Sequence, residues 1–154
     1  MRIRLLKKNE IKEVAKLLVT AYETEKNDRR WDEKYAEEYV SIIYRMCNKL
    51  CFVAVEDGKI VGVTLNIIMP EFNKNILESR VLLVHPDYRR QKIGTKLIIK
   101  VCEKALNDLK IDEIESSIYT LTNFPITWYE CIGFRTKKYY ETTRANIANI
   151  LNKI

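Results

Sequence analysis

The fold of this chain is decided by the stretch Val84-His85-Pro86-Asp87-Tyr88-Arg89-Arg90-Gln91-Lys92-Ile93-Gly94-Thr95. It leads into the clearest helical pattern of the chain, in which apolar or small residues share one face: Gly94, Leu97, Ile98, Val101, Cys102, Ala105, Leu106 and Leu109. The first N–H groups of a helix are unpaired and carry partial positive charge, so they suit phosphate oxygens. Arg89, Arg90 and Lys92 add full charges, and Gly94 permits close backbone approach. The stretch therefore predicts a turn that binds an anion such as a pyrophosphate.

Two strands flank this turn and helix. Residues Ile76 to Val84 precede them and Asp112 to Leu121 follow, which predicts a right-handed crossover between parallel strands. Upstream, Cys51 to Glu56 and Lys59 to Ile68 are joined by Asp57-Gly58, the strongest short hairpin signal, and we expect Pro70 to end the second strand. Arg2 to Leu6 reads as an opening strand. The order of elements indicates an α/β fold with a mixed sheet.

Further helices are expected before and after these strands in the chain. Asn9 is a candidate cap for a helix with the apolar face Ile11, Val14, Ala15, Leu18 and Tyr22. Asp32 is a candidate N-cap for a second helix, with the buried stripe Tyr35, Ala36, Tyr39, Ile42, Ile43, Met46 and Cys47. A short helix from Phe124 ends at Cys131, with Gly133 as its C-cap. Phe134 to Glu141 reads as a last strand, and the tail from Ala145 fits a helix or a short strand.

Composition limits the class of protein. With 154 residues, 47% hydrophobic and 31% charged, we expect one globular domain spanning residues 1–154. The longest apolar run, Leu50 to Val55, is too short to cross a membrane. The N-terminus lacks the apolar core of a secretory signal, so a cytoplasmic location is expected. The net charge of +6 favours an anionic partner, and the basic residues concentrate between Pro86 and Lys110.

The side chains that ligate metals or act as nucleophiles are few. The four cysteines (Cys47, Cys51, Cys102 and Cys131) are best read as buried thiols, and a single histidine leaves too few ligands for a zinc site. No metal is therefore expected. His85 has no evident partner for a hydrolase triad, and no nucleotide-binding glycine pattern is present.

At this point the sequence resembles the GNAT superfamily of acetyl-CoA-dependent N-acetyltransferases. The family consensus Val-x-Pro-x-Tyr-Arg-x-x-Gly-x-Gly is similar to residues 84–94, and a later Tyr-Glu-x-x-Gly-Phe motif is matched by residues 129–134. Lys92 departs from the pattern because it stands where the first glycine is usual. The segment from Asn123 to Tyr129 is one residue shorter than usual, which makes Asn123 the less secure correspondence.

The resemblance implies a GNAT-like fold, a mixed sheet flanked by about four helices, with acetyl-CoA as cosubstrate. The backbone of Leu83 and Val84 is then expected to pair with the pantetheine arm, and Asn123 to touch it. The resemblance assigns the pyrophosphate to the turn and the start of the helix, at Arg89, Arg90, Gln91, Lys92, Ile93, Gly94 and Thr95.

The reaction requires a neutral amine, because an ammonium has no lone pair to attack the thioester. Glu78 is a candidate general base, where some family members carry one. In a regular strand it would share a face with Ile76, Arg80, Leu82 and Val84. The alternative for Glu78 is an ion pair with Arg80. Tyr129 matches the family's general acid, which stabilises the departing thiolate; the alternative is a packed aromatic beside Trp128.

The resemblance implies that the acceptor is a primary amine of a small molecule, peptide or protein. Acceptor sites of the superfamily involve the first two helices and the loop between them, and residues 22–38 of this chain are locally acidic. The alternatives are a non-catalytic acyl-CoA-binding or nucleic-acid-binding module on the same fold, although the basic residues form no distributed stripe. The apolar C-terminal residues Ile147, Ile150, Leu151 and Ile154 are expected to cover the chain's own sheet or to pair with a second subunit. Because dimers are common in the family that the sequence resembles, the resemblance implies a homodimer. No membrane partner is expected.

Overall fold

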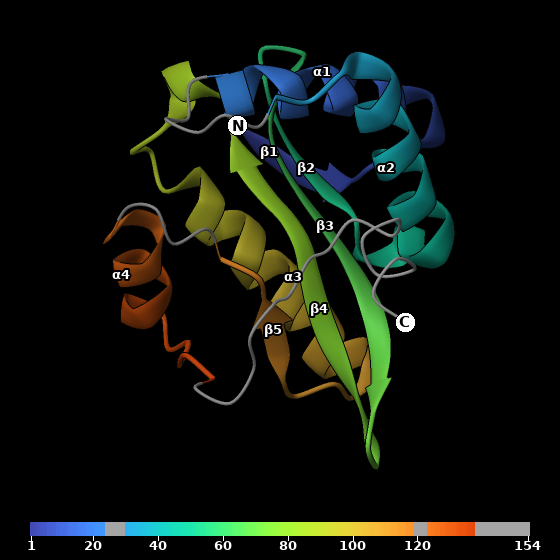
Figure 1. Ribbon diagram of the computed structural model, residues 1–154, viewed down its shortest axis with the longest axis vertical. Coiled ribbons are helices and arrows are strands. Elements are labelled where there is room, and N and C mark those ends of the chain that lie inside the picture. Colours follow the sequence, from blue (N-terminus) through green and yellow to red (C-terminus); the bar gives the residue numbers. More distant parts are fainter. Residues whose placement is uncertain (24–29, 119–122, 138–154) are drawn as a thin grey trace, which may run out of the picture. The chain divides into compact units, whose positions relative to one another are not determined.

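The computed structural model describes residues 1–23, 30–118 and 123–137 (Figure 1). The chain divides into two compact units, Met1–Ser117 and Ile118–Ile154, and each is described by itself. The first unit contains the strands β1 Arg2–Leu5, β2 Phe52–Glu56, β3 Lys59–Glu71, β4 Lys74–Val84 and β5 Ile114–Ser116, and the helices α1 Ile11–Glu23, α2 Glu33–Cys47 and α3 Ile93–Leu109. The second contains α4 Asn123–Cys131.

The strands form one sheet in the order β1-β2-β3-β4-β5. Neighbours from β1 to β4 are antiparallel, whereas β4 and β5 are parallel and α3 connects them. The predicted α/β fold with a mixed sheet is therefore confirmed, and so is the parallel pairing around α3. Of the expected strand Asp112 to Leu121, only Ile114–Ser116 is strand among the described residues, and 119–122 lie outside them.

Helix α3 packs closely on the sheet and passes behind β3 and β4 in the view of Figure 1. Gly62 of β3 makes this approach possible. A Cβ atom at Gly62 would lie 3.0 Å from Cγ2 of Ile93 and 3.2 Å from Cδ1 of Leu97, closer than side chains normally pack. The face of α3 that meets the sheet consists of buried residues: Ile93, Leu97, Ile98, Val101 and Ala105. Leu106, expected on this face, is exposed instead.

Helices α1 and α2 pack against each other and against β3. The Asp32 carboxylate accepts hydrogen bonds from the backbone N–H groups of Lys34 and Tyr35, so the predicted N-cap of α2 is confirmed. Asn9 is not a cap, because a short 3-10 helix, Lys8–Glu10, precedes α1. The predicted stripe of α2 is too wide: Tyr35, Ile42 and Met46 are exposed, while the buried residues are Ala36, Val40, Ile43 and Cys47.

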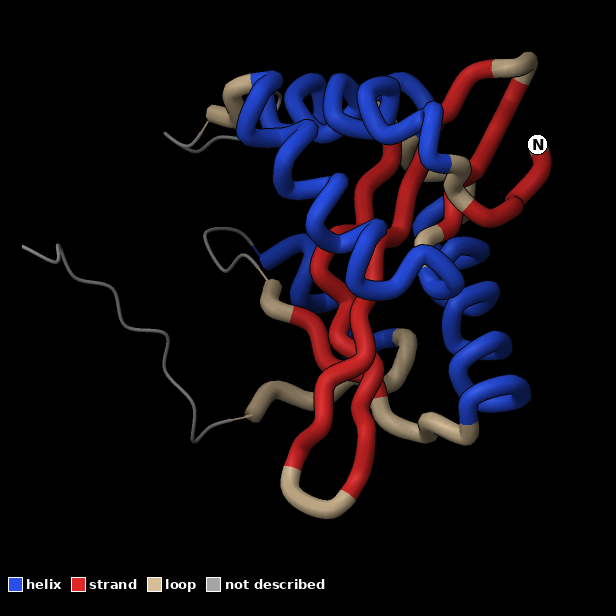
Figure 2. Tube along the Cα trace, turned by 90° about the vertical axis from the view of Figure 1, so that its right-hand side faces the viewer, coloured by secondary structure: helices blue, strands red, loops and turns tan. Residues whose placement is uncertain are grey.

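The two hairpins follow different rules. Asp57 and Gly58 have φ angles of 47° and 78°, the left-handed pair that the predicted tight turn requires. The expectation that Pro70 ends β3 was wrong, since Pro70 pairs with Asn75 inside a hairpin that continues to Glu71. Proline is tolerated at strand positions where its missing N–H is not needed. The long β3–β4 hairpin extends beyond the helices of the first unit (Figure 2).

The second unit is described from α4 to Lys137. Helix α4 ends before Gly133, whose φ of 105° fits the predicted C-cap. The described residues 134–137 form no strand, so that part of the expected strand Phe134 to Glu141 is wrong, and 138–141 lie outside the described residues together with the tail. No helix among the described residues is long and apolar enough to span a bilayer.

Candidate active site

Strand β4 is interrupted by a bulge at Arg80. Leu65 of β3 pairs with Val81 and the next residue, Asn66, pairs with Ser79, so Arg80 is an extra residue without a partner in β3. Paired residues share a face of the sheet, and Glu78 pairs with Ile67 whereas Val84 pairs with Gly62. Those partners are an odd number of residues apart on β3. Glu78 therefore lies on the opposite face from Val84.

This geometry corrects the sequence-based expectation for Glu78. A regular strand would have placed it on one face with Leu82 and Val84, but the extra residue reverses the alternation between them. Val84 faces α3, since its Cγ2 lies 3.9 Å from the position of a Cβ at Gly94. Glu78 faces the other side of the sheet, where Tyr39 of α2 interacts with the neighbouring Arg80.

The bulge is also where β5 leaves β4. Their parallel pairing covers Leu77 with Ile114, Glu78 with Glu115 and Ser79 with Ser116, and there it stops. From Arg80 to Val84, β4 has β3 on one side and no described strand on the other (Figure 1). The predicted residues Leu83 and Val84 lie on this open edge. An open strand edge offers backbone N–H and C=O groups to an extended ligand.

After Val84 the chain forms a tight turn. His85 continues the β3 ladder by donating its N–H to the carbonyl of Val61 (2.9 Å), and its Nδ1 accepts the N–H of Asp87 at 3.3 Å. A 3-10 helix, Pro86–Tyr88, follows. Arg90 and Lys92 then adopt left-handed backbone, with φ of 63° and 59°. This conformation explains why glycine is usual at the position of Lys92, since a side chain there is strained.

The N-terminus of α3 has no cap of its own. The Lys92 side chain makes no capping hydrogen bond, and the first helical bond is from the N–H of Lys96 to the carbonyl of Lys92 (3.0 Å). Within the described part of the chain, the N–H groups of Ile93, Gly94 and Thr95 have no acceptor. A Cβ at Gly94 would meet only Val84, at 3.9 Å, so packing does not require a glycine. The uncapped N–H groups and the open space fit a pyrophosphate.

The basic residues of the turn are used in two ways. The Arg89 guanidinium reaches the carbonyl of Val84 (3.4 Å, from Nε) and the carbonyl of Ala21 at the end of α1 (3.3 Å, from Nη2). Arg89 therefore ties the turn to α1 through its side chain. Arg90, Gln91 and Lys92 are exposed, which leaves their side chains accessible to an anionic ligand.

Glu78 and Arg80 form an ion pair on β4, with side chains 21% and 40% exposed. The pKa of Arg80 is raised, chiefly by its hydrogen bond to Glu78; burial opposes the rise and the Tyr39 phenol adds to it. The ring of Tyr39 lies 5.1 Å from that of Trp31, which in turn meets Tyr22 edge-on at 6.3 Å. The ion pair expected as the alternative role of Glu78 is therefore present, and the same carboxylate is the candidate base.

Tyr129 belongs to the second unit. It is buried, 7% exposed, with its ring edge-on to those of Trp128 (4.8 Å) and Phe134 (4.9 Å). The hydrogen bond from the N–H of Phe134 to the carbonyl of Tyr129 (3.0 Å) closes the end of α4 around this ring. Asn123 is the first residue of α4, and its side chain lies outside the described part.

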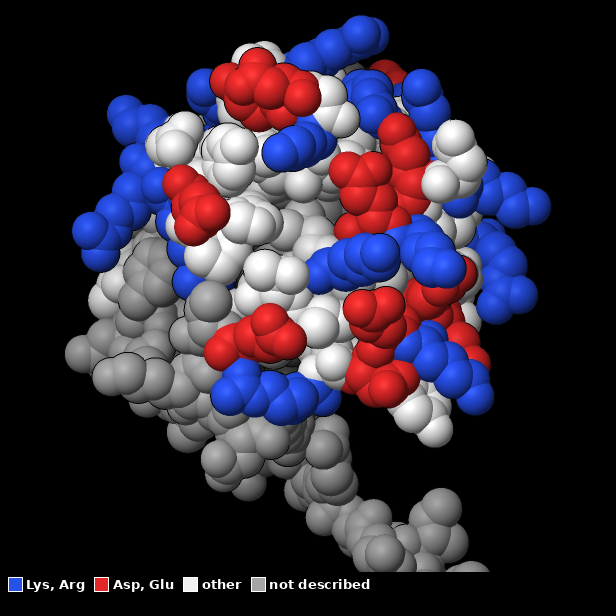
Figure 3. Space-filling model, turned by 90° about the horizontal axis from the view of Figure 1, so that it is seen from above, with Lys and Arg blue, Asp and Glu red and all other residues white. Residues whose placement is uncertain are grey.

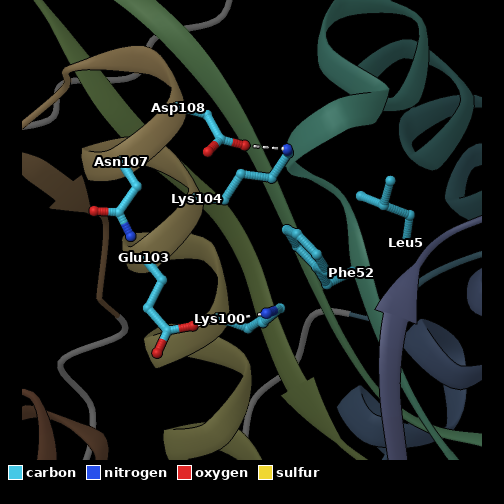
Figure 4. A pocket seen from close by; sticks show the side chains of 7 residues that line it. All are labelled: Leu5, Phe52, Lys100, Glu103, Lys104, Asn107 and Asp108. Carbon is cyan, nitrogen blue, oxygen red and sulfur yellow. Dashed lines mark hydrogen bonds and ion pairs between the residues drawn. The ribbon is translucent and has the colours of Figure 1, made fainter.

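A hollow of about 280 Å³ lies elsewhere, between α3 and the strands β1 and β2 (Figure 4). Its charged residues pair with one another: Lys104 with Asp108 at 2.7 Å, and Lys100 with Glu103 at 3.7 Å. It is far along α3 from Gly94 and offers no unpaired helix N–H groups. We therefore do not assign a ligand to it.

Three further features concern cysteines, acidic clusters and surface charge. Among the described residues, no group of three or more His, Cys, Asp or Glu side chains is arranged to hold a metal ion. Burial raises the pKa of the Cys51 thiol to about 12, so it is a poor nucleophile. Acidic and basic side chains are interspersed on the face seen in Figure 3, which gives no continuous basic stripe there for a nucleic acid.

Comparison with known proteins identifies the family of this chain. Residues 47–136, which include the open edge, the turn and α4, match the acetyltransferase (GNAT) domain model. N-alpha-acetyltransferase 30 of Dictyostelium discoideum is 31% identical over an alignment of 120 residues, and the match covers 71% of this chain and 63% of that protein. The chain belongs to the GNAT acetyltransferase family. It spans less than two thirds of the length of this curated relative.

Solved structures share this fold. A ribosomal-protein-alanine N-acetyltransferase from Brucella melitensis biovar Abortus 2308 superimposes with a TM-score of 0.74 at 22% identity, covering 94% of this chain and all of that one (100%). An aminoglycoside N-acetyltransferase in complex with CoA gives 0.74 at 15% identity, covering 94% and 93%. At these identities the likeness concerns the fold.

Three features of this GNAT domain escaped the reading of its sequence. The bulge at Arg80 has no local signal, since Ser79 and Arg80 fit a regular strand. The contact of Arg89 with Ala21 joins residues far apart in the chain. Gly62 was recognisable only as a glycine inside a strand, a pattern that often marks close approach of another element.

Proposed function

We propose that the chain transfers the acetyl group of acetyl-CoA to the α-amino group of a polypeptide. The observation that carries this proposal is the uncapped N-terminus of α3 beside the open edge of β4, within a GNAT domain. The similarity to an enzyme named as an N-alpha-acetyltransferase supports the choice of acceptor, and a structural neighbour is named as a ribosomal-protein-alanine N-acetyltransferase. A small amine is the second candidate, because another neighbour is an aminoglycoside N-acetyltransferase.

The residues of the first unit bind the cosubstrate in this proposal. The open edge at Leu83 and Val84 pairs with the pantetheine amides as an added strand. The N–H groups from Gln91 to Thr95 surround the pyrophosphate, and Arg90 and Lys92 contribute positive charge. Arg89 positions this turn through its backbone and its bonds to Val84 and Ala21. Asn123 touches the pantetheine arm.

The reaction is a direct attack of the amine on the thioester within a ternary complex. Glu78 accepts a proton from the acceptor ammonium, which frees the nitrogen lone pair. The nitrogen then forms a bond to the acetyl carbon, and the C–S bond breaks as the tetrahedral intermediate collapses. The nitrogen of the intermediate loses one of its two protons to solvent and keeps the other as the amide N–H. Tyr129 donates a hydrogen bond to the departing thiolate, which takes up a proton from Tyr129 or from solvent and leaves as CoA thiol. Tyr129 then regains its proton from solvent, and Glu78 releases to solvent the proton that it accepted.

An α-amino group suits this mechanism for a simple reason. Its pKa is about 7.7–8.0, against about 10.4 for a lysine side chain, so about a tenth of it is already neutral near pH 7, whereas a lysine side chain is almost wholly protonated. A carboxylate base therefore removes its proton at a lower free-energy cost. The acceptor approaches from the side of α1 and α2, where Tyr22, Trp31 and Tyr39 lie near Arg80.

The test is acetylation of synthetic peptides with acetyl-CoA, followed by mass spectrometry. Peptides with a free α-amine should gain one acetyl group, whereas N-terminally blocked peptides containing lysine should remain unchanged. Glu78→Gln and Tyr129→Phe are expected to lower kcat by about 100-fold or more, the usual effect of removing a general acid or base. Equal modification of both peptides would mean that the enzyme does not select the α-amine over lysine. Modification of neither peptide, but of an aminoglycoside or polyamine, would favour a small acceptor.

We also propose a cytoplasmic location and a homodimer. The first is supported by free cysteines, which are typical of a reducing compartment: Cys47, Cys51, Cys102 and Cys131. The second rests on the apolar C-terminal residues alone. Light scattering of the purified chain should give twice the mass of 18.2 kDa; a monomer at micromolar concentration would contradict the dimer.

A further inference from the structure

Arg80 occupies an unusual position in the sheet. It is the extra residue of the β4 bulge, without a partner in β3, and it directly follows Ser79, where β5 leaves β4. Bulges re-aim side chains and recur beside active sites. An arginine here is held by its side-chain contacts rather than by the regular pairing of the strand.

The Arg80 side chain connects two groups on different elements. Its Nη1 donates to Oε1 of Glu78 on the same strand, and it also interacts with Tyr39 of α2. Tyr39 is itself fixed by its ring contact with Trp31, with centroids 5.1 Å apart. The guanidinium thus joins the candidate base to Tyr39 of α2.

Glu78 needs such a partner for an electrostatic reason. Its register partner on β5 is Glu115, and like charges opposite each other in a sheet repel. A cation beside Glu78 offsets this repulsion and favours one orientation of its carboxylate. A guanidinium suits the task because its planar fork has five donors and can engage two groups at once, whereas an ammonium acts as a point charge.

We propose that Arg80 is a positioning residue, which holds the Glu78 carboxylate toward the open edge of β4 and couples its orientation to Tyr39 of helix α2. This inference rests on the proposed function, since it assumes that Glu78 is the base. Arg80 itself touches neither acetyl-CoA nor the transferred group. Its side chain acts through Glu78.

The experiment compares steady-state kinetics of Arg80→Met, Glu78→Gln and the double variant with peptide and acetyl-CoA. We expect Arg80→Met to lower kcat by about 10–100-fold, the scale of a misplaced catalytic group, with the KM for acetyl-CoA unchanged. The double variant should be no slower than Glu78→Gln alone, because both changes remove one function. Arg80→Lys should recover part of the kcat, and Tyr39→Phe should cost a few-fold.

A matched control is Lys74→Met, which removes another cation of β4 that is ion-paired, in this case to Glu113. Its kcat should equal that of the wild type. Thermal unfolding of every variant shows whether it is folded, and Arg80→Lys keeps the test usable if Arg80→Met unfolds.

Additive losses of kcat in the double variant would overturn the role of Arg80. An Arg80→Met variant with a raised KM for the peptide and an unchanged kcat would also overturn it, because Arg80 would then bind the acceptor. Full activity of Glu78→Gln would overturn it as well. The proposed function fails in a different way, when the wild type acetylates no amine.

Discussion

At the scale of single residues, Lys92 shows how the site differs from the usual family pattern. Its φ of 59° lies in the left-handed region, where glycine is comfortable and a side chain is strained. The residue nevertheless adds a positive charge at the N-terminus of α3, where an anionic ligand is expected. Local stability and ligand binding therefore favour different residues here.

Replacing Lys92 by glycine should separate these two effects. We expect the free energy of unfolding to rise by about 1 kcal/mol and Tm by about 2–4 °C, because the strain is relieved. The Kd for acetyl-CoA should rise severalfold through loss of the charge. Thermal unfolding and calorimetric titration measure both. Lys92→Ala is the control, which loses the charge but keeps the strain; a stabilised alanine variant would refute this explanation.

Gly94 is expected to behave in the opposite way. Because a Cβ there would meet only Val84, at 3.9 Å, Gly94→Ala should leave the apo protein as stable or up to about 1 kcal/mol more stable. The added methyl group would occupy the space assigned to the pyrophosphate, so the Kd for acetyl-CoA should rise about tenfold or more. Unchanged affinity would show that the ligand does not approach α3 at this residue.

At the scale of elements, the relation between α3 and β3 determines where the anion-binding turn lies. Gly62 allows Ile93 and Leu97 to contact the backbone of the sheet. The periodicity of α3 predicted the helix and most of its buried face, since a helical stripe is a local signal. The sequence of β4 did not predict its bulge, because a bulge depends on pairing with β3 and no residue type specifies it.

Gly62→Ala should therefore disturb the anion-binding turn by displacing α3 from the sheet. The added methyl group meets three atoms at 3.0–3.3 Å, so α3 must shift, and we expect a loss of about 1–3 kcal/mol in the free energy of unfolding. Affinity for acetyl-CoA should fall as well, which contrasts with the stability-neutral Gly94→Ala. Urea unfolding with a wild-type midpoint would mean that the helix adjusts without cost.

At the scale of the whole molecule, the sequence predicted the order of elements, the mixed sheet and the family. The motif residues 84–94 and 129–134 are contiguous, so they are recognisable without a structure. What escaped prediction depends on distant parts of the chain, such as the face of Glu78 and the Arg89 contact with Ala21. The exposure of three apolar side chains of α2 was not predicted for a related reason. The apolar periodicity of a helix does not show how much of its surface other elements cover.

The free energy of unfolding of the first unit should depend on pH because of Glu10. The Arg4 guanidinium makes two bonds to this carboxylate (2.6 and 2.8 Å) and lowers its pKa, and the Lys7 N–H contributes as well. A lowered native pKa stabilises the fold above the unfolded value of about 4.5, and this stabilisation is lost as pH falls through the native value. Glu10→Gln should cost about 1–2 kcal/mol at pH 7 and much less at pH 2–3.

The measurement is urea unfolding of the wild type and Glu10→Gln across this pH range. Lys104→Met, which removes an exposed helical pair with Asp108, serves as the control and should leave the free energy of unfolding nearly unchanged, because surface ion pairs contribute little. If the free energies of unfolding of the wild type and Glu10→Gln differed by the same amount at every pH, the Arg4–Glu10 ion pair could not be the cause of the difference.

The central claim is that the uncapped N-terminus of α3 binds the pyrophosphate of acetyl-CoA. Calorimetric titration of acetyl-CoA into the wild type and Gly94→Asp tests it most directly, because the aspartate places a negative charge among the free N–H groups without disturbing a packed contact. The account predicts saturable binding by the wild type and its loss in the folded variant. Equal affinity of the two proteins would place the cosubstrate elsewhere and contradict the account.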